Sequence, residues 1–128
     1  AADAVLSAAG FNLARLYRLV RGGTRDLKRA HKLYRQAADA CLVEAQLSLA
    51  MLYEAGQGWR RDREMAAYWY RRAAVGGSVA GQINLAFLYA EGVGVEKDLV
   101  EAYAWYSVPA KTNHPVALAN LDVLHDVL

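Results

Sequence analysis

Hydrophobic residues between positions 43 and 74 fall into two stripes, separated by a polar segment that contains glycine. In each stripe the apolar positions recur at spacings of three and four residues, which places them on one face of an α-helix. The first stripe contains Ala45, Leu49, Leu52 and Tyr53, and the second contains Ala66, Trp69, Tyr70, Ala73 and Ala74. No segment shows sustained alternation of apolar and polar residues, so the pattern predicts helices and no strands.

Glycine and aspartate residues mark the ends of these two helices. Gly56 follows the first stripe and tolerates the positive φ at which many helices end, and Gly58 continues the turn. Asp62 precedes the second stripe, where its carboxylate can accept hydrogen bonds from the free N–H groups of the first turn. Residues 76–78 (Gly-Gly-Ser) close the unit and can cap the next helix. The segment therefore predicts a helical hairpin with defined ends.

The same hairpin recurs every 36 residues along the chain. Identical residues then fill several columns: Leu13, Leu49, Leu85 and Leu121; Tyr17, Tyr53 and Tyr89; Asp26, Asp62 and Asp98; Tyr34, Tyr70 and Tyr106. A fixed period of this length indicates a stacked array. We predict an all-α fold, a right-handed α-α superhelix (solenoid) of about 3.5 antiparallel helix pairs. Residues 1–128 would form one domain, with repeats near 3–38, 39–74 and 75–110 and a partial repeat at 111–128.

Other columns hold only small residues. Ala9, Ala45, Gly81 and Ala117 align, and so do Ala14, Ala50 and Ala86. A methyl group or hydrogen at these positions lets two helix axes approach, while larger residues fill the layer between them. We therefore expect close helix packing at these columns, and we expect Trp69 and Trp105 to lie in the core.

The net charge of +2 is unevenly distributed along the chain. Residues 1–38 carry +6, residues 39–74 carry 0 and residues 75–128 carry −4. Arg25, Lys28, Arg29, Lys32 and Arg35 lie on or beside one predicted second helix. Such a patch offers an alternative function, the binding of nucleic acid or another acidic partner through the N-terminal half. The acidic final repeats oppose a polyanion, so nucleic acid is the weaker alternative.

Composition and motifs argue against several other classes of protein. No apolar run approaches the roughly 18 residues of a membrane span. The single cysteine, Cys41, excludes an internal disulfide and a cysteine-based zinc site. Cys41 aligns with Gly77 and Asn113 in a turn, where it is either an inert small residue or a reactive thiol.

No catalytic motif, metal-binding cluster or cofactor motif occurs in the sequence. Residues 92–94 (Gly-Val-Gly) are interpreted as a helix stop rather than a phosphate loop. We therefore expect no enzymatic activity and no cofactor.

The columns resemble the Sel-one-like repeat (SLR) family, a relative of the tetratricopeptide repeat. The third repeat matches its pattern through Leu85-Ala86, Leu88-Tyr89, Gly92 and Gly94, Asp98, Ala102 and Trp105-Tyr106, and the second repeat matches at the equivalent positions. Repeat one departs, with Val20 in a glycine column and Leu33 in the tryptophan column. Pro109 replaces an alanine and should shorten or kink its helix. The single cysteine excludes the family's disulfide-stitched branch.

The resemblance implies a non-catalytic adaptor that binds a protein or peptide on its concave face. Many members come from bacterial envelopes, so a periplasmic or secreted location is expected. The chain as given shows no signal-peptide pattern.

In the related families the first helix of each pair lines the concave side of the superhelix. The implied partner-binding residues are Phe11, Arg15, Arg18, Leu47, Met51, Glu54, Ile83, Phe87, Glu91 and Val123. Alternatively, Leu47, Ile83 and Phe87 pack between neighbouring first helices.

Two further features bear on binding. Trp59 lies in a turn, where it either anchors a partner or folds back over its own loop. The fourth unit has a first helix and no second, so Leu118, Leu121 and Leu124 should lack part of their cover. The chain is then a piece of a longer array, or its final helix acts as a cap, or this uncapped helix supports weak self-association.

Overall fold

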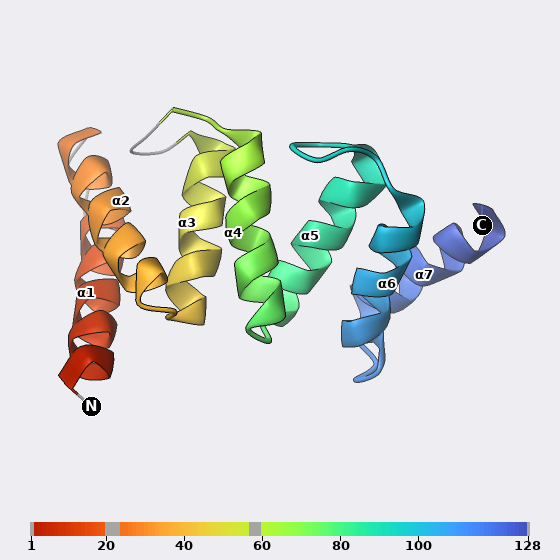
Figure 1. The fold of residues 1–128 in the computed structure, drawn as a ribbon, viewed down its shortest axis with the longest axis horizontal. Coiled ribbons are helices and arrows are strands. Elements are labelled where there is room, and N and C mark those ends of the chain that lie inside the picture. Colours follow the sequence, from red (N-terminus) through yellow and green to blue (C-terminus); the bar gives the residue numbers. More distant parts are fainter. Residues whose placement is uncertain (1, 20–23, 57–59, 128) are drawn as a thin grey trace.

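The computed structural model describes residues 2–19, 24–56 and 60–127, with side chains for residues 8–17, 27–56 and 60–127. Within these ranges the elements are α1 (Ala2–Leu19), α2 (Thr24–Asp39), α3 (Val43–Ala55), α4 (Arg63–Val75), α5 (Val79–Glu91), α6 (Leu99–Ala110) and α7 (Pro115–Val127). No described residue is in a strand, so the all-α prediction is confirmed. Figure 1 shows the helices side by side in a row, with the termini at opposite ends.

Each helix packs mainly on the helices before and after it in the sequence. α1 packs on α2, α2 on α3, and this order continues to α6 and α7. Contacts between sequence neighbours are the mark of a solenoid, in which a unit hides its apolar stripe against the next unit. We refer to α1, α3, α5 and α7 as the first helices and to α2, α4 and α6 as the second helices.

The predicted helix ends are confirmed where the chain is described. Gly56 and Gly92 end α3 and α5 in the left-handed conformation, with φ of 72° and 70°. The carboxylate of Asp62 accepts a hydrogen bond from the backbone N–H of Met65 at 3.0 Å, and Asp98 accepts from Glu101 at 3.1 Å. Ser78 caps α5 in the same way. The altered first turn of repeat one, including Val20, and the turn residue Gly58 lie outside the described residues.

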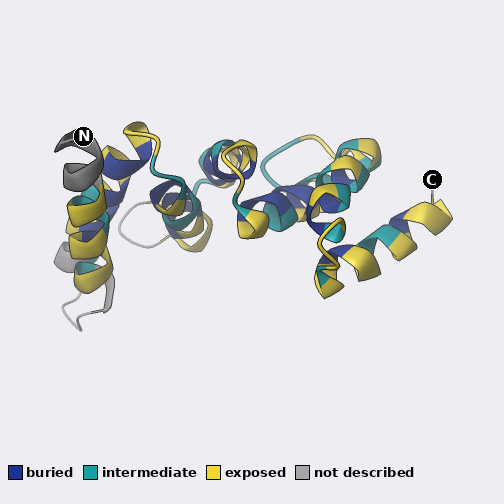
Figure 2. Cartoon of the chain, turned by 90° about the horizontal axis from the view of Figure 1, so that it is seen from below, coloured by how far each residue is buried: buried dark blue, intermediate teal, exposed yellow. Residues whose placement is uncertain are grey.

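The core runs along the row between the first and second helices (Figure 2). Trp69 is almost fully buried, as expected for its column, and Leu49 and Leu85 are completely buried. Trp105 is half-buried and packs against the two hydrophobic clusters that make up the core. The shared columns therefore place the same kind of side chain in the same layer of successive repeats.

The small columns allow the close packing that the sequence predicts. A Cβ atom at Gly81 would lie 3.1 Å from the Cβ of Ala73, so a side chain there would require α4 and α5 to shift by a few tenths of an ångström. Pro109 lies in the last turn of α6, which ends at Ala110. The equivalent helix α4 ends at Val75, one column position later, so the expected shortening amounts to one residue.

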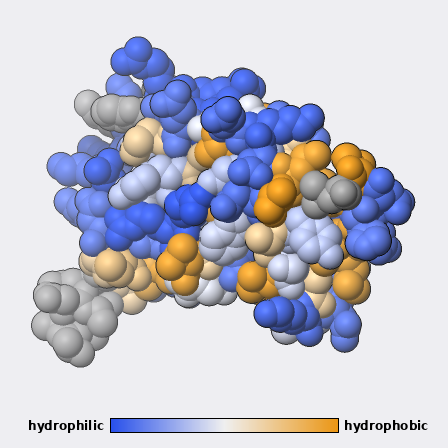
Figure 3. All heavy atoms as spheres, turned by 45° about the vertical axis from the view of Figure 1, so that its right-hand side comes forward, coloured by the Kyte–Doolittle hydropathy of each residue, from blue (hydrophilic) through white to orange (hydrophobic). Residues whose placement is uncertain are grey.

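The two ends of the row differ from its middle. Leu13 and Leu16 of α1 are exposed, because no described helix pair covers that side of α1. At the other end Leu118 is exposed as expected, but Leu124 is buried because α7 packs on α6. Val123 and Val127 of α7 are also exposed, and Figure 3 shows apolar side chains gathered at this end of the molecule.

Candidate functional site

The predicted binding residues lie on all four first helices, but they differ in exposure. Phe11 and Leu47 are half-buried against the larger hydrophobic cluster, and Ile83 is half-buried against the smaller one. Leu47 and Ile83 therefore contribute to packing within the chain. Phe87 is different, because 52% of its surface is exposed. The side chains of Arg18 and Trp59 lie outside the described residues.

Four of the exposed residues occupy one column of the repeat. These are Arg15, Met51, Phe87 and Val123, and the three apolar ones are exposed by 45%, 52% and 63%. The residue before each of the first three is an alanine that is completely buried. We call these four residues the exposed row. Each first helix therefore presents one large side chain of this row at the surface. In the first three of these helices it follows directly after a completely buried alanine.

A hollow of about 550 Å³ lies where repeats two and three meet. We call it the repeat groove, and its lining residues are Glu54, Arg61, Arg63, Asn84, Phe87, Leu88 and Val93. It brings together two of the predicted residues, Glu54 and Phe87. Leu47 lines a separate hollow with Glu44 and Ser78. The groove also contains Arg61, Arg63, Asn84, Leu88 and Val93, which are not among the predicted peptide-binding residues, because those came from chosen columns of the first helices and from one loop residue, Trp59. The sequence pattern predicts the two arginines only as part of a basic surface for an acidic partner.

The chain between α3 and α4 places the two arginines over the groove. Gly56 reverses the chain so closely that a Cβ atom there would lie 3.3 Å from the Cβ of Arg61. The N–H of Asp62 then donates to the carbonyl oxygen of Tyr53 at 3.0 Å, and the Asp62 carboxylate caps α4. Arg61 and Arg63 flank this cap, so their backbone positions are fixed by hydrogen bonds on either side.

The loop after α5 closes the other side of the groove. Gly94, with φ of 72°, lies against the start of α4: a Cβ atom on it would overlap the carbonyl oxygen of Arg63 and lie 2.6 Å from the carbonyl carbon. Only glycine permits this approach. Val93, the preceding residue, thereby lines the groove beside Arg63. A contact between repeats two and three thus sets the width of the groove.

A buried tyrosine fixes one carboxylate of the groove. The hydroxyl of Tyr70 on α4 donates a hydrogen bond to Glu54, and Tyr70 is almost fully buried. Burial, and then the charge and hydrogen bond of Glu54, raise the pKa of Tyr70 far above its usual value. Burial and Glu91 raise the pKa of Tyr106 in the next repeat. Glu54 therefore accepts a hydrogen bond from the core while its side chain remains exposed at the groove.

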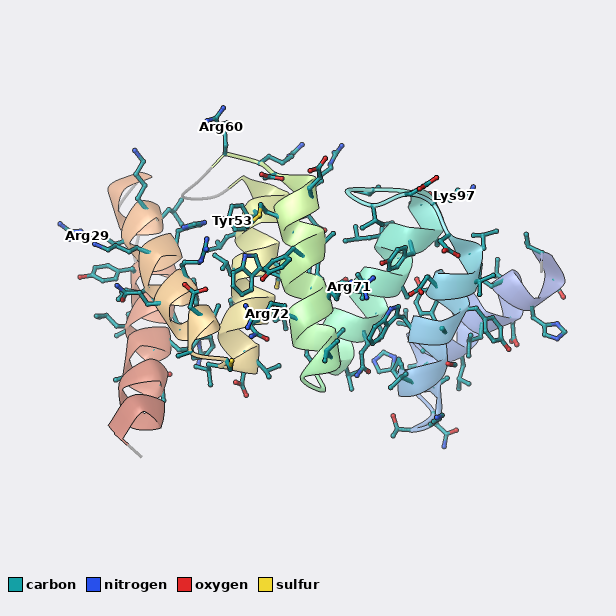
Figure 4. The ribbon with its side chains drawn as sticks, viewed as in Figure 1. Arg29, Tyr53, Arg60, Arg71, Arg72 and Lys97 are labelled. Atoms are coloured by element: carbon teal, nitrogen blue, oxygen red, sulfur yellow. The ribbon has the colours of Figure 1, made fainter. Side chains whose placement is uncertain are left out.

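The basic residues of α2 and α4 are partly engaged in packing. The guanidinium groups of Arg35 and Arg72 lie 5.4 and 5.1 Å from the centre of the Trp69 ring, and Arg35 also pairs with Asp39 at 3.3 Å. Arg71 stacks over Tyr89 in the same manner. In Figure 4, Arg29 projects outward from α2, whereas Arg71 and Arg72 lie over the body of the molecule. These contacts give several arginines a structural role that does not require an acidic partner.

Metal-binding and membrane-spanning features are absent from the part of the chain that the structure describes. Within it, no three histidine, cysteine, aspartate or glutamate residues lie together as a possible metal site. None of its helices combines the length and apolar character needed to cross a membrane. Cys41 is exposed in a turn, and its Sγ lies 3.8 Å from a guanidinium nitrogen of Arg72.

Comparison with known proteins gives consistent results. A family model for the Sel1 repeat matches residues 7–40, 43–78 and 79–107. The chain is similar to a protective antigen present in uropathogenic Escherichia coli strains that displays an SLR fold, with 32% identity and a TM-score of 0.85 over 95% of this chain. It is also similar to a Sel1 repeat protein from Oxalobacter formigenes, with 27% identity and a TM-score of 0.85 over 94% of this chain.

A third solved structure shares the fold alone. It is the Helicobacter pylori cysteine rich protein B, with 18% identity and a TM-score of 0.71, covering 89% of this chain and 90% of that one. The chain spans only 26% of the Escherichia coli protein and 49% of the Oxalobacter protein. No curated protein sequence matches the chain.

Proposed function

This chain belongs to the Sel1 repeat family, and on that premise we propose that it is a non-catalytic module that binds a polypeptide across its first helices. Sel1 repeats are commonly protein–protein interaction modules, and proteins built from them are generally not catalytic. The proposal adds a binding face to this general role. The partner lies along the exposed row, in contact with Met51 and Phe87, and its path crosses the repeat groove.

The exposed row is the observation that carries the proposal. A large apolar side chain on the surface costs little on its own, and single ones are common. Here, however, Met51, Phe87 and Val123 recur at one column, and the first two follow alanines that are completely buried. An extended peptide that crosses successive repeats would meet Arg15 on α1 and one such apolar side chain on each of the other three first helices. Covering the exposed half of Phe87 alone would contribute about 1 kcal/mol of binding free energy.

Peptide display tests this proposal even though the natural partner is unidentified. A library of random dodecapeptides is selected on the immobilised chain, and enriched peptides are synthesised with a fluorescein label. Their affinities are measured by fluorescence anisotropy for the wild-type chain and for the Met51→Glu and Phe87→Glu variants. We expect each variant to weaken binding by about tenfold or more, because a charge replaces an apolar contact.

Tyr68→Glu is the matched control for this experiment. Tyr68 is aromatic and 49% exposed, close to the value for Phe87, but it lies on the second helix α4. Its substitution should leave affinity nearly unchanged. Peptides that lose affinity for Tyr68→Glu and keep it for Phe87→Glu would place binding on the second helices and contradict the proposal. A library that yields no binding peptide at all would also contradict it.

A further inference from the structure

We propose that the repeat groove selects peptides in which a carboxylate lies next to a large apolar side chain. This inference rests on the proposed function and adds a chemical class of partner to it. The groove combines an apolar surface, formed by Phe87, Leu88 and Val93, with two guanidinium groups, those of Arg61 and Arg63. A partner with only an apolar side chain would leave the guanidinium groups unpaired, and a partner with only a carboxylate would leave the apolar surface uncovered.

The apolar part of the groove is open to a partner. Phe87 is exposed by 52%, whereas Leu88, the next residue of α5, is almost completely buried and also lines the groove. Val93 is half-buried, and it is held in place by the contact of the adjacent Gly94 with the start of α4. A branched or aromatic side chain of the partner can therefore pack against a surface that is already formed, with little ordering cost.

The two arginines give the groove its charge preference. Both are exposed, and neither forms a salt bridge among the residues that the structure describes. Two acids adjoin them in sequence: Asp62 directs its carboxylate to the backbone N–H of Met65, and Glu64 lines a neighbouring hollow together with both arginines. Arginine binds carboxylates through paired hydrogen bonds, which are stronger than hydrogen bonds between neutral groups. A carboxylate of the partner thus finds two donors whose backbone positions are fixed.

The negative charge of Glu54 restricts where in the groove the partner's carboxylate can bind. Its own carboxylate is held by the Tyr70 hydroxyl, and it repels a second negative charge on its side of the groove. The partner's carboxylate is therefore directed toward Arg61 and Arg63, with the neighbouring apolar residue over Phe87. The same carboxylate disfavours a continuous polyanion such as single-stranded DNA, because a chain of phosphates would have to pass Glu54.

The test uses the dodecapeptides selected on the wild-type chain, together with the double variant Arg61→Glu/Arg63→Glu. We expect the selected peptides to be enriched in aspartate or glutamate adjacent to a leucine, isoleucine, valine or phenylalanine. The double variant should bind them about tenfold more weakly. Arg60→Glu is the matched control, since Arg60 is exposed and next to Arg61 but does not line the groove. It should change affinity by about twofold or less.

Charge reversal of the peptide distinguishes a specific loss of affinity from misfolding of the double variant. When the acidic residue of a selected peptide is replaced by lysine, the wild-type chain should bind it more weakly and the double variant should recover affinity. Selected peptides without acidic residues, or equal binding by the wild type and the double variant, would overturn the inference while leaving the proposed function intact. Tighter binding of a 20-nucleotide poly-dT than of the peptides would overturn it as well. If the wild-type chain selects no peptide, both the inference and the proposed function fail.

Discussion

The side-chain amide of Gln82 donates a hydrogen bond of 3.2 Å to the backbone carbonyl oxygen of Ala74. Gln46 makes the equivalent bond to Ala38 at 3.3 Å, and both glutamines are buried, with exposures of 6% and 4%. Each bond joins a first helix to the end of the preceding second helix, whose last carbonyl groups have no partner within the helix. Two successive junctions between repeats are therefore held by the same polar contact.

Replacement of Gln82 by alanine should lower the free energy of unfolding by about 1–2 kcal/mol. The Ala74 carbonyl still accepts from the N–H of Gly77, so the loss is that of one bond and of the packed side chain. Urea denaturation followed by circular dichroism measures the change. Gln36→Ala is the control, because Gln36 is exposed on α2, and it should stay within about 0.5 kcal/mol of wild type. Equal stability of the two variants would show that the junction bond contributes nothing.

Cys41 should be a site where glycine stabilises the protein. Its φ of 67° lies in the left-handed region, which costs a residue with a Cβ atom about 1–2 kcal/mol. Part of this gain is offset by the greater freedom of glycine in the unfolded chain. We expect Cys41→Gly to raise the thermal midpoint and Cys41→Ala to leave it near wild type.

Gly77, in the same column, supplies the reverse test. Its φ is 99°, and a Cβ atom added there would meet nothing within 4 Å, so only the backbone conformation opposes a side chain. Gly77→Ala should therefore lower the midpoint. If Cys41→Gly and Gly77→Ala shift the midpoint in the same direction, backbone strain does not govern this turn.

A second glycine pair separates close contact from backbone strain. Gly92 and Gly94 have nearly equal φ, of 70° and 72°, but a Cβ atom at Gly92 would meet the Cβ of Lys97 at 3.1 Å, whereas one at Gly94 would overlap the Arg63 carbonyl. We expect Gly94→Ala to cost at least about 1 kcal/mol more than Gly92→Ala. Urea denaturation of the two variants measures the difference. Equal costs would mean that the loop does not rest on the start of α4.

Stability should fall in mildly acidic solution because of His31. Burial, and then the positive charge of Arg35, lower the pKa of His31 below its usual 6.5. Below about pH 6.5 the unfolded chain therefore binds a proton that the folded chain resists. The contribution of His31 is complete above the unfolded pKa and is lost as the pH falls from there toward the folded pKa.

Urea denaturation between pH 5.5 and pH 7.5 measures this dependence. His31→Phe keeps a ring against Tyr53, whose centroid lies 4.9 Å from that of His31, and should reduce the loss of stability on acidification. His125→Gln is the control, because His125 is exposed. If His31→Phe loses as much stability as wild type over this range, another group causes the pH dependence.

The fold was predictable from the sequence because the residue type that recurs in each column indicates either a core position or a helix boundary. A leucine that recurs at one helical position lies in the core of the middle repeats, as Leu49 and Leu85 do. A glycine or aspartate that recurs at a boundary ends or caps a helix, as Gly56 and Asp62 do. The Cys41 column also contained a signal that the prediction did not use. Gly77 and Asn113 share it, and glycine and asparagine are the residues that tolerate positive φ.

The candidate site was only partly predictable. Ile83 and Phe87 are both large, apolar and one turn apart on α5, so the sequence offers no reason for one to be half-buried and the other exposed. Arg63 joins the groove through the contact of its carbonyl group with Gly94, which depends on how two repeats are placed relative to each other. Neither fact follows from the properties of one helix, because both arise from packing between repeats.

Site-specific photo-crosslinking tests the central claim most directly. A benzoylphenylalanine is introduced at Phe87 in one variant and at Tyr68 in another, two positions of nearly equal exposure on first and second helices. Each is irradiated with a peptide selected on the wild-type chain, and crosslinked product is quantified by mass spectrometry. We expect efficient crosslinking from position 87 and little from position 68. Crosslinking from position 68 in preference to position 87 would contradict that claim.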